Sequence, residues 1–106
     1  AERLAGLGVA YCDAPVLGSV PAVRAGALTV LAGGSDGDLA RARVALDAFA
    51  ARVVHAGDVG SGNVLKLAMN VLVAGFTELL GEATLLAERA GVGAAGVRAA
   101  LEASVL

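Results

Sequence analysis

The chain has 106 residues, which allows one modest domain or part of a larger one. Hydrophobic residues make up 58% of the chain and aromatic residues only 3%, so any core is built from Ala, Val and Leu and depends on extensive burial. The net charge is -2, with eight basic and ten acidic residues spread along the chain, and this leaves no basic patch for nucleic acid or an anionic membrane.

Three further features bear on location and completeness. No run reaches the roughly 18 uninterrupted apolar residues of a membrane span, so we expect no membrane partner. The single cysteine, Cys12, excludes an internal disulfide and fits a reducing compartment, which predicts a cytoplasmic protein. Residues 1–6 resemble the last turn of a helix, and residues 101–106 continue a helical pattern without a stop signal. We therefore expect this chain to be a piece of a longer protein.

Alternating strand and helix signals fill the first half of the chain. Short apolar runs predict strands at residues 9–12, 28–32 and 52–55. His55 ends the third run and is either a titrating or a structural histidine; the lack of a nearby partner in the sequence favours the structural role. This order predicts a mainly three-layer α/β domain. N-cap candidates at 35–38 begin a helix whose apolar face comprises Leu39, Ala42, Ala45, Leu46 and Phe49.

A proline-containing loop, residues 13–21, follows the first predicted strand. Its two prolines stiffen the backbone at two points, and Gly18 and Ser19 between them keep it permissive. Clustered backbone N–H groups in such a loop bind carboxylate or phosphate oxygens. An ordinary connection from strand to helix explains the same spacing, so both interpretations stay open here.

The second half begins with a glycine-rich loop that runs into a long apolar helix at residues 60–70. Between residues 64 and 76 only Lys66 and Asn70 are polar, and their i, i+4 spacing puts both on one helical face. A helix that is apolar all round is normally buried, so these polar groups need a partner or a cavity. We interpret them as lining a cavity. The alternative is a lysine that snorkels to water and an asparagine bonded to nearby backbone.

The helical pattern continues as far as Gly91, with glutamates only in its later turns, which predicts a helix buried early and exposed late. Gly75 and Gly81 inside it cost about 1 kcal/mol each relative to alanine. We therefore expect another helix to pack closely against them. Residues 94–104 predict the beginning of a further helix.

Three motifs stand in order along the chain. Residues 13–19 read D-A-P-V-L-G-S and resemble D-A-P-V-S-G-G; residues 26–29 read G-A-L-T and resemble G-T-L-T. Residues 62–70 read G-N-V-L-K-L-A-M-N and resemble G-x-x-x-K-x-x-x-N. Together they resemble the β-hydroxyacid dehydrogenase family, which includes 3-hydroxyisobutyrate, tartronate semialdehyde and 6-phosphogluconate dehydrogenases. The resemblance covers essentially the whole chain.

The resemblance implies an α/β fold in two parts. Residues 1–59 would be the C-terminal part of a Rossmann-type dinucleotide-binding domain, and residues 60–106 an interdomain helix followed by the start of an all-helical domain. The implied activity is hydride transfer between a small 3-hydroxyacid and NAD or NADP, in a homodimer or homotetramer. No G-x-G-x-x-G follows a strand here, so the cofactor-binding residues are expected outside this chain, and the chain alone is expected to be inactive.

The resemblance also assigns site residues. Lys66 would be the general acid/base for the substrate hydroxyl, and Asn70 would hold the substrate beside it. Leu17, Gly18 and Ser19 would receive the substrate carboxylate; no metal is implied. Leu17 replaces the family's serine and Ser19 its second glycine, so the identity of the acid stays open. Two alternatives remain: a relative of imine reductases, which usually lack the lysine, and a non-catalytic helical interaction module.

Overall fold

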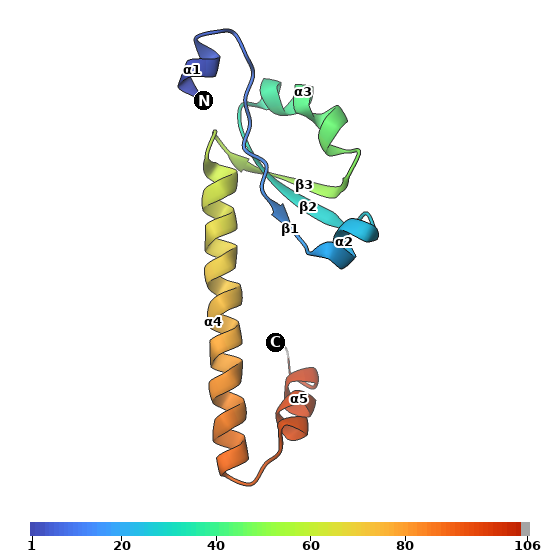
Figure 1. Cartoon of the computed structure of the whole chain (residues 1–106), viewed down its shortest axis with the longest axis vertical. Coiled ribbons are helices and arrows are strands. Elements are labelled where there is room, and N and C mark those ends of the chain that lie inside the picture. Colours follow the sequence, from blue (N-terminus) through green and yellow to red (C-terminus); the bar gives the residue numbers. More distant parts are fainter. Residues whose placement is uncertain (105–106) are drawn as a thin grey trace. The chain divides into compact units, whose positions relative to one another are not determined.

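The computed structural model describes residues 1–104. The chain forms two compact units, residues 1–69 and residues 70–106, with the boundary inside one long helix. The elements that the structure describes are, in chain order, α1 (Glu2–Ala5), β1 (Val16–Leu17), α2 (Val20–Arg24), β2 (Leu28–Gly33), α3 (Asp36–Leu46), β3 (Ala50–Gly57), α4 (Ser61–Arg89) and α5 (Ala94–Glu102) (Figure 1).

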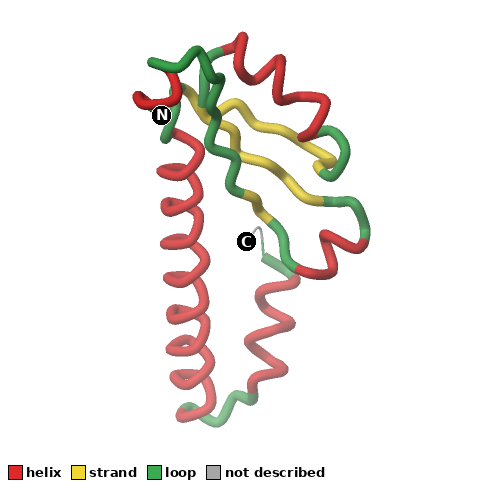
Figure 2. The backbone as a smooth tube through the Cα atoms, turned by 45° about the horizontal axis from the view of Figure 1, so that its top comes forward, coloured by secondary structure: helices red, strands yellow, loops and turns green. Residues whose placement is uncertain are grey.

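The first unit is built on a three-stranded sheet in the order β1-β2-β3 (Figure 2). The short β1 pairs antiparallel with β2, placing Val16 opposite Val30, whereas β2 and β3 are parallel. Parallel strands need a crossover connection, and α3 supplies it. The predicted α/β fold is confirmed.

The core lies between β2 and α3. Val30 and Ala32 are fully buried, and Leu46 at the end of α3 packs against them. Ser35 begins α3 as its N-cap, because its Oγ accepts the backbone N–H of Asp38 at 3.1 Å. The predicted helix is thus confirmed, with one correction: it ends at Leu46, so Phe49 lies in the following turn and is exposed.

The strand predicted at residues 9–12 is wrong. That segment joins no ladder in the described chain, and Val9 and Tyr11 are exposed. Pairing starts only at Asp13, whose N–H donates to the Gly33 carbonyl at 3.0 Å and whose carbonyl accepts the Gly33 N–H at 2.8 Å. The first true strand, β1, lies within the region predicted as a loop, and α2 begins in the same region.

Helix α4 has the predicted position and spans 29 residues, but the prediction that its early turns are buried is wrong. Gly62 is its one buried residue, and Val64 and Leu67 are 67% and 64% exposed. No other atoms come within 4 Å of a Cβ built at Gly75 or Gly81, so no described segment packs closely there. The apolar pattern of α4 predicts that its side chains are buried against another segment, but no described segment packs over these positions.

By length and composition, with a mean hydropathy of 1.5 in its most apolar window, α4 is also able to cross a membrane. Core helices of water-soluble proteins meet the same criterion.

Helix α5 begins at Ala94, as predicted, but ends at Glu102 with Ala103 as its C-cap. The expectation of an unstopped helix over residues 101–106 is therefore wrong up to Ser104, and residues 105–106 lie outside the described part.

Gly62 offers a test of the packing at the start of α4. A Cβ at Gly62 would collide with the Leu31 carbonyl oxygen and lie 2.8 Å from Asp13 Oδ2. We expect Gly62→Ala to lower the free energy of unfolding by about 1–3 kcal/mol, as overpacking does. Gly75→Ala is the matched control in the same helix, where the open surroundings predict a gain of up to about 1 kcal/mol. Urea titration followed by circular dichroism measures both, and equal effects would contradict the close packing at Gly62.

The exposed apolar face of α4 predicts that the 106-residue chain associates at micromolar concentration. Val71, Leu72 and Phe76 are 71%, 65% and 54% exposed, and contiguous apolar surface of this kind drives association. Light scattering should show oligomers, and Leu72→Lys combined with Phe76→Lys should shift them towards monomer. Val44→Lys on α3 is the control at an isolated exposed valine and should change nothing. A monodisperse, folded wild-type monomer would contradict the prediction.

Candidate functional site

The predicted carboxylate-binding residues form one tight turn between β1 and α2. Leu17 ends β1 and is half-buried, and Ser19 is the N-cap of α2. Gly18 has φ +123°, and a Cβ there would come within 2.8 Å of Leu28 Cδ2 and 2.9 Å of Ala22 Cβ. Both the backbone conformation and the close approach therefore require glycine at this position.

This turn leaves polar groups open to solvent. Gly18 and Ser19 are exposed, and among the turn and loop backbone hydrogen bonds of the described residues neither N–H group donates. The Ser19 side chain makes no capping hydrogen bond to α2. Two backbone donors and a hydroxyl in one turn can bind a carboxylate, as the sequence predicts.

Lys66 and Asn70 lie four residues apart on α4. Lys66 is half-buried and makes no ion pair within residues 1–104. Asn70 is exposed and is the first residue of the second unit. No hydrogen bond in the described part of the chain joins either residue to the turn at 17–19. The structure therefore groups Leu17, Gly18 and Ser19 along one turn, and their joint site with Lys66 and Asn70 stays a prediction.

The sequence reasoning missed the role of Asp13. Its side chain is 5% exposed and reaches the start of α4, where Oδ1 accepts the Gly60 N–H at 2.5 Å and Oδ2 accepts the Asn63 N–H at 2.7 Å. A carboxylate is well suited to this end of a helix, because the first turn has unpaired N–H donors and a positive dipole end. An aspartate directly after an apolar segment was the available signal, but its partners are 47 and 50 residues away.

Two glycines make room for this carboxylate. A Cβ on Gly33 would collide with Asp13 Oδ1, and it would lie 2.7 Å from the Asp58 carbonyl oxygen and 2.9 Å from the Gly62 backbone nitrogen. Gly62 in turn sits against the end of β2, and the Ser61 N–H donates to the Asp58 carbonyl at 2.9 Å. The end of β2, the loop after β3 and the first turn of α4 therefore meet around Asp13.

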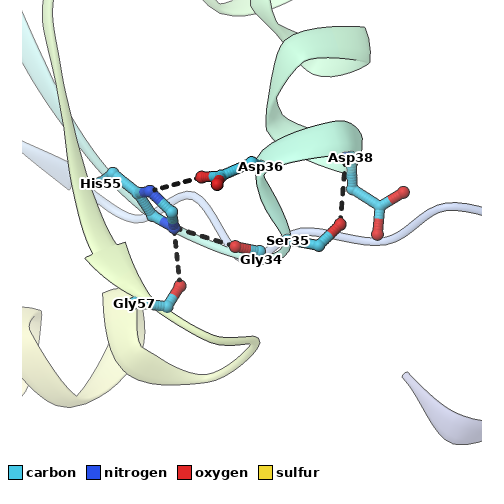
Figure 3. Close-up of polar contacts among 6 residues, drawn as sticks. All are labelled: Gly34, Ser35, Asp36, Asp38, His55 and Gly57. Atoms are coloured by element: carbon cyan, nitrogen blue, oxygen red, sulfur yellow. Dashed lines mark hydrogen bonds and ion pairs between the residues drawn. The ribbon is translucent and has the colours of Figure 1, made fainter.

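His55 links the ends of the two parallel strands (Figure 3). Its Nε2 lies 2.9 Å from the Gly34 carbonyl oxygen and 3.1 Å from that of Gly57, and since carbonyls only accept, Nε2 carries the proton. Nδ1 is 3.4 Å from Asp36 Oδ1, but that carboxylate is almost fully exposed and the contact contributes little. The Gly34 carbonyl, 21 residues away, and the nearby Gly57 carbonyl thus hold His55, in agreement with the predicted structural role.

A hollow of about 220 Å³ lies between α3 and β3, lined by His55, Asp36 and Arg43 together with apolar residues. Its charged groups have partners: Arg43 Nε lies 2.8 Å from Asp47 Oδ1, and Asp36 faces His55. Among residues 1–104, no group of three or more His, Cys, Asp and Glu side chains is arranged to hold a metal ion. The catalytic residue predicted from the sequence does not line this hollow.

The first unit is an α/β fold with one parallel strand pair joined by a crossover helix, and comparison with known proteins names the family. The profile of the NAD-binding domain of 6-phosphogluconate dehydrogenase matches residues 1–57. The chain belongs to this family, and the resemblance to β-hydroxyacid dehydrogenases is confirmed. NAD or NADP is the cofactor that this family indicates.

Similar sequences agree with this assignment. 3-Hydroxyisobutyrate dehydrogenase of Pseudomonas aeruginosa is 38% identical over 106 residues, which cover 100% of this chain and 33% of that enzyme. A probable 3-hydroxyisobutyrate dehydrogenase of Mycobacterium tuberculosis is 36% identical over 87 residues, which cover 82% of this chain and 30% of that protein. The chain thus spans about a third of the length of the relatives it matches.

Solved structures show the same fold. The Mycobacterium tuberculosis 3-hydroxyisobutyrate dehydrogenase, solved with L-serine, superposes with a TM-score of 0.90 at 30% identity and covers 98% of this chain and 36% of that one. An imine reductase from a Pseudomonas species has a TM-score of 0.70 at 20% identity, over 92% of this chain and 34% of that one. At that identity the likeness to the imine reductase concerns the fold alone.

The N-termini of α3 and α4 do not offer a full set of free N–H groups to the pyrophosphate of a dinucleotide. Helix N-termini bind phosphate through free N–H groups, but Ser35 takes the Asp38 N–H at the start of α3. The Asp13 carboxylate accepts hydrogen bonds from the N–H groups of Gly60 and Asn63 at the start of α4. A negatively charged side chain already occupies the position that a phosphate would need, so no step of binding the cofactor is assigned to these helix ends.

Proposed function

We propose that this chain is part of an NAD(P)-dependent oxidoreductase that acts on a small 3-hydroxyacid of the 3-hydroxyisobutyrate type. The observation that carries the proposal is Lys66, a half-buried cation on an apolar stretch of α4 with no ion-pair partner within residues 1–104. A lysine so placed suits proton transfer at a substrate hydroxyl. Similarity to 3-hydroxyisobutyrate dehydrogenases along the whole chain supports the choice of substrate class.

Each part of the proposed site has one task. The N–H groups of Gly18 and Ser19 and the Ser19 hydroxyl bind the substrate carboxylate, and Leu17 shapes the apolar side of the turn. Asn70, one helical turn from Lys66, holds the substrate by hydrogen bonds. As the neutral amine, Lys66 takes the hydroxyl proton during oxidation and becomes the ammonium; as the ammonium, it returns the proton during reduction. The nicotinamide, when bound, accepts or supplies the hydride.

The proposal extends to the organisation of the enzyme. Residues 1–59 complete a dinucleotide-binding domain, and residues 60–106 form the interdomain helix and the start of a helical domain. The 106-residue chain alone is inactive, because it has no glycine-rich dinucleotide fingerprint of its own. We further propose that the enzyme is cytoplasmic and forms a homodimer or homotetramer through its helical part.

Two other functions make different predictions. An imine reductase would reduce imines without depending on Lys66, and the lysine therefore favours the hydroxyacid. A non-catalytic interaction module would show no turnover with either nicotinamide. A panel of 3-hydroxyacids and imines, offered to the full-length protein with NAD and with NADP, separates the three functions.

The first test of the mechanism is Lys66→Met in the full-length protein, a change that keeps the apolar stem and removes the amine. We expect kcat to fall by roughly 10²- to 10⁴-fold, the usual contribution of a positioned proton-transfer group, with the fold intact. An ionisation in the pH profile of kcat/KM should disappear with the amine. Arg89→Met, at the far end of α4, is the matched loss of a cation and should leave kcat unchanged. An active Lys66→Met enzyme with an unaltered pH profile would remove Lys66 from the mechanism.

The second test separates binding from folding in the turn at 17–19. Ser19→Ala should raise KM for the hydroxyacid several-fold without changing stability, because the Ser19 side chain makes no capping hydrogen bond and is exposed. Gly18→Val, by contrast, should lower both substrate affinity and stability, because its Cβ would press on Leu28 and Ala22. Steady-state kinetics and thermal unfolding of the two variants measure this split. An unchanged KM in a folded Ser19→Ala enzyme would show that the hydroxyl does not touch the substrate.

A further inference from the structure

We propose that Asp13 is a positioning residue for catalysis, fixing the first turn of α4 and through it Lys66. The proposal rests on the proposed function, in which Lys66 transfers the proton. By resemblance Asp13 is the first residue of a substrate-binding motif, D-A-P-V-L-G-S. In the structure it faces the start of α4, and both carboxylate oxygens are already engaged by backbone N–H groups.

The first step of the argument is that Asp13 is itself rigidly held. Its backbone N–H and carbonyl both pair with Gly33 at the end of β2, at 3.0 and 2.8 Å. Its side chain is nearly fully buried, and the missing Cβ atoms of Gly33 and Gly62 leave only enough room for the carboxylate. A larger or rotated side chain would not fit this position.

The second step is that this contact fixes the part of α4 that belongs to the first unit. Among residues 63–69 of the first unit none is fully buried, so the first turn of α4 supplies the fixed attachment to the sheet. The Asp13 carboxylate accepts hydrogen bonds from this turn at two positions, the N–H groups of Gly60 and Asn63. Lys66 follows Asn63 by three residues, close to one helical turn, so a tilt of the first turn moves the Lys66 amine. A catalytic group displaced by about 1 Å can lose about 10²-fold in rate.

The experiment uses the full-length enzyme and Asp13→Asn, which keeps the shape but replaces one acceptor oxygen by an NH₂ donor facing a backbone N–H. We expect kcat to fall about 10- to 100-fold and KM for the hydroxyacid to rise by a smaller factor, since Asn70 moves with the helix while the groups that bind the substrate carboxylate lie on another segment. Ser35→Ala is the matched control: it removes the N-cap of α3 and should leave kcat unchanged. If Asp13→Asn does not fold, Asp13→Ser, which keeps one acceptor and adds no opposing donor, takes its place.

A double variant separates positioning from direct contact. If Asp13 acts through Lys66, then Asp13→Asn combined with Lys66→Met is no slower than Lys66→Met alone. Fully multiplied losses in kcat, or a loss expressed mainly in KM, would show that Asp13 does not act through Lys66 and would overturn the proposal. If Lys66→Met loses activity while Asp13→Asn keeps the kcat of the wild type, the positioning role of Asp13 is overturned and the proposed function is not. An active Lys66→Met would overturn the proposed function first, and the positioning role with it.

Discussion

The contact of Asp13 with the start of α4 is the constraint on which the arrangement of the first unit depends. A buried carboxylate is costly unless it is hydrogen-bonded, and here both oxygens accept backbone N–H groups that a helix end leaves unpaired. Hydrogen bonds to a charged group contribute about 1.5–3 kcal/mol each. Two of them, with the approach of Gly62 to the Leu31 carbonyl, hold the first turn of α4 to the sheet.

Local patterns in the sequence predicted the elements well where the cause of each element is local. The apolar run at 28–32 became the buried strand β2, and Ser35 caps α3 because a serine oxygen can reach an N–H three residues on. The long apolar period predicted α4 within a few residues of its bounds. These features follow from side-chain spacing and backbone preferences over a few residues, so one sequence suffices to find them.

The failures share one physical origin, which is that pairing and burial depend on distant residues. The segment at 9–12 has strand composition but no partner strand in the described chain, so it stays unpaired. Helix α4 has core composition, yet its early turns are exposed. Asp13 had no local reason to be a helix cap, so its role was visible only when the fold brought Gly60 and Asn63 to it.

The candidate site shows how motifs far apart in sequence depend on one another. Asp13 opens the first motif and Gly62 opens the last, and in the structure these two residues are neighbours. From Asp13 the chain continues to the turn at 17–19; from Gly62 it continues along α4 to Lys66. One junction is therefore the common origin of the proposed carboxylate-binding turn and of the proposed proton-transfer group. Because both segments start from the same rigid point, a change there alters their relative geometry, whereas a change at the exposed end of α4 does not.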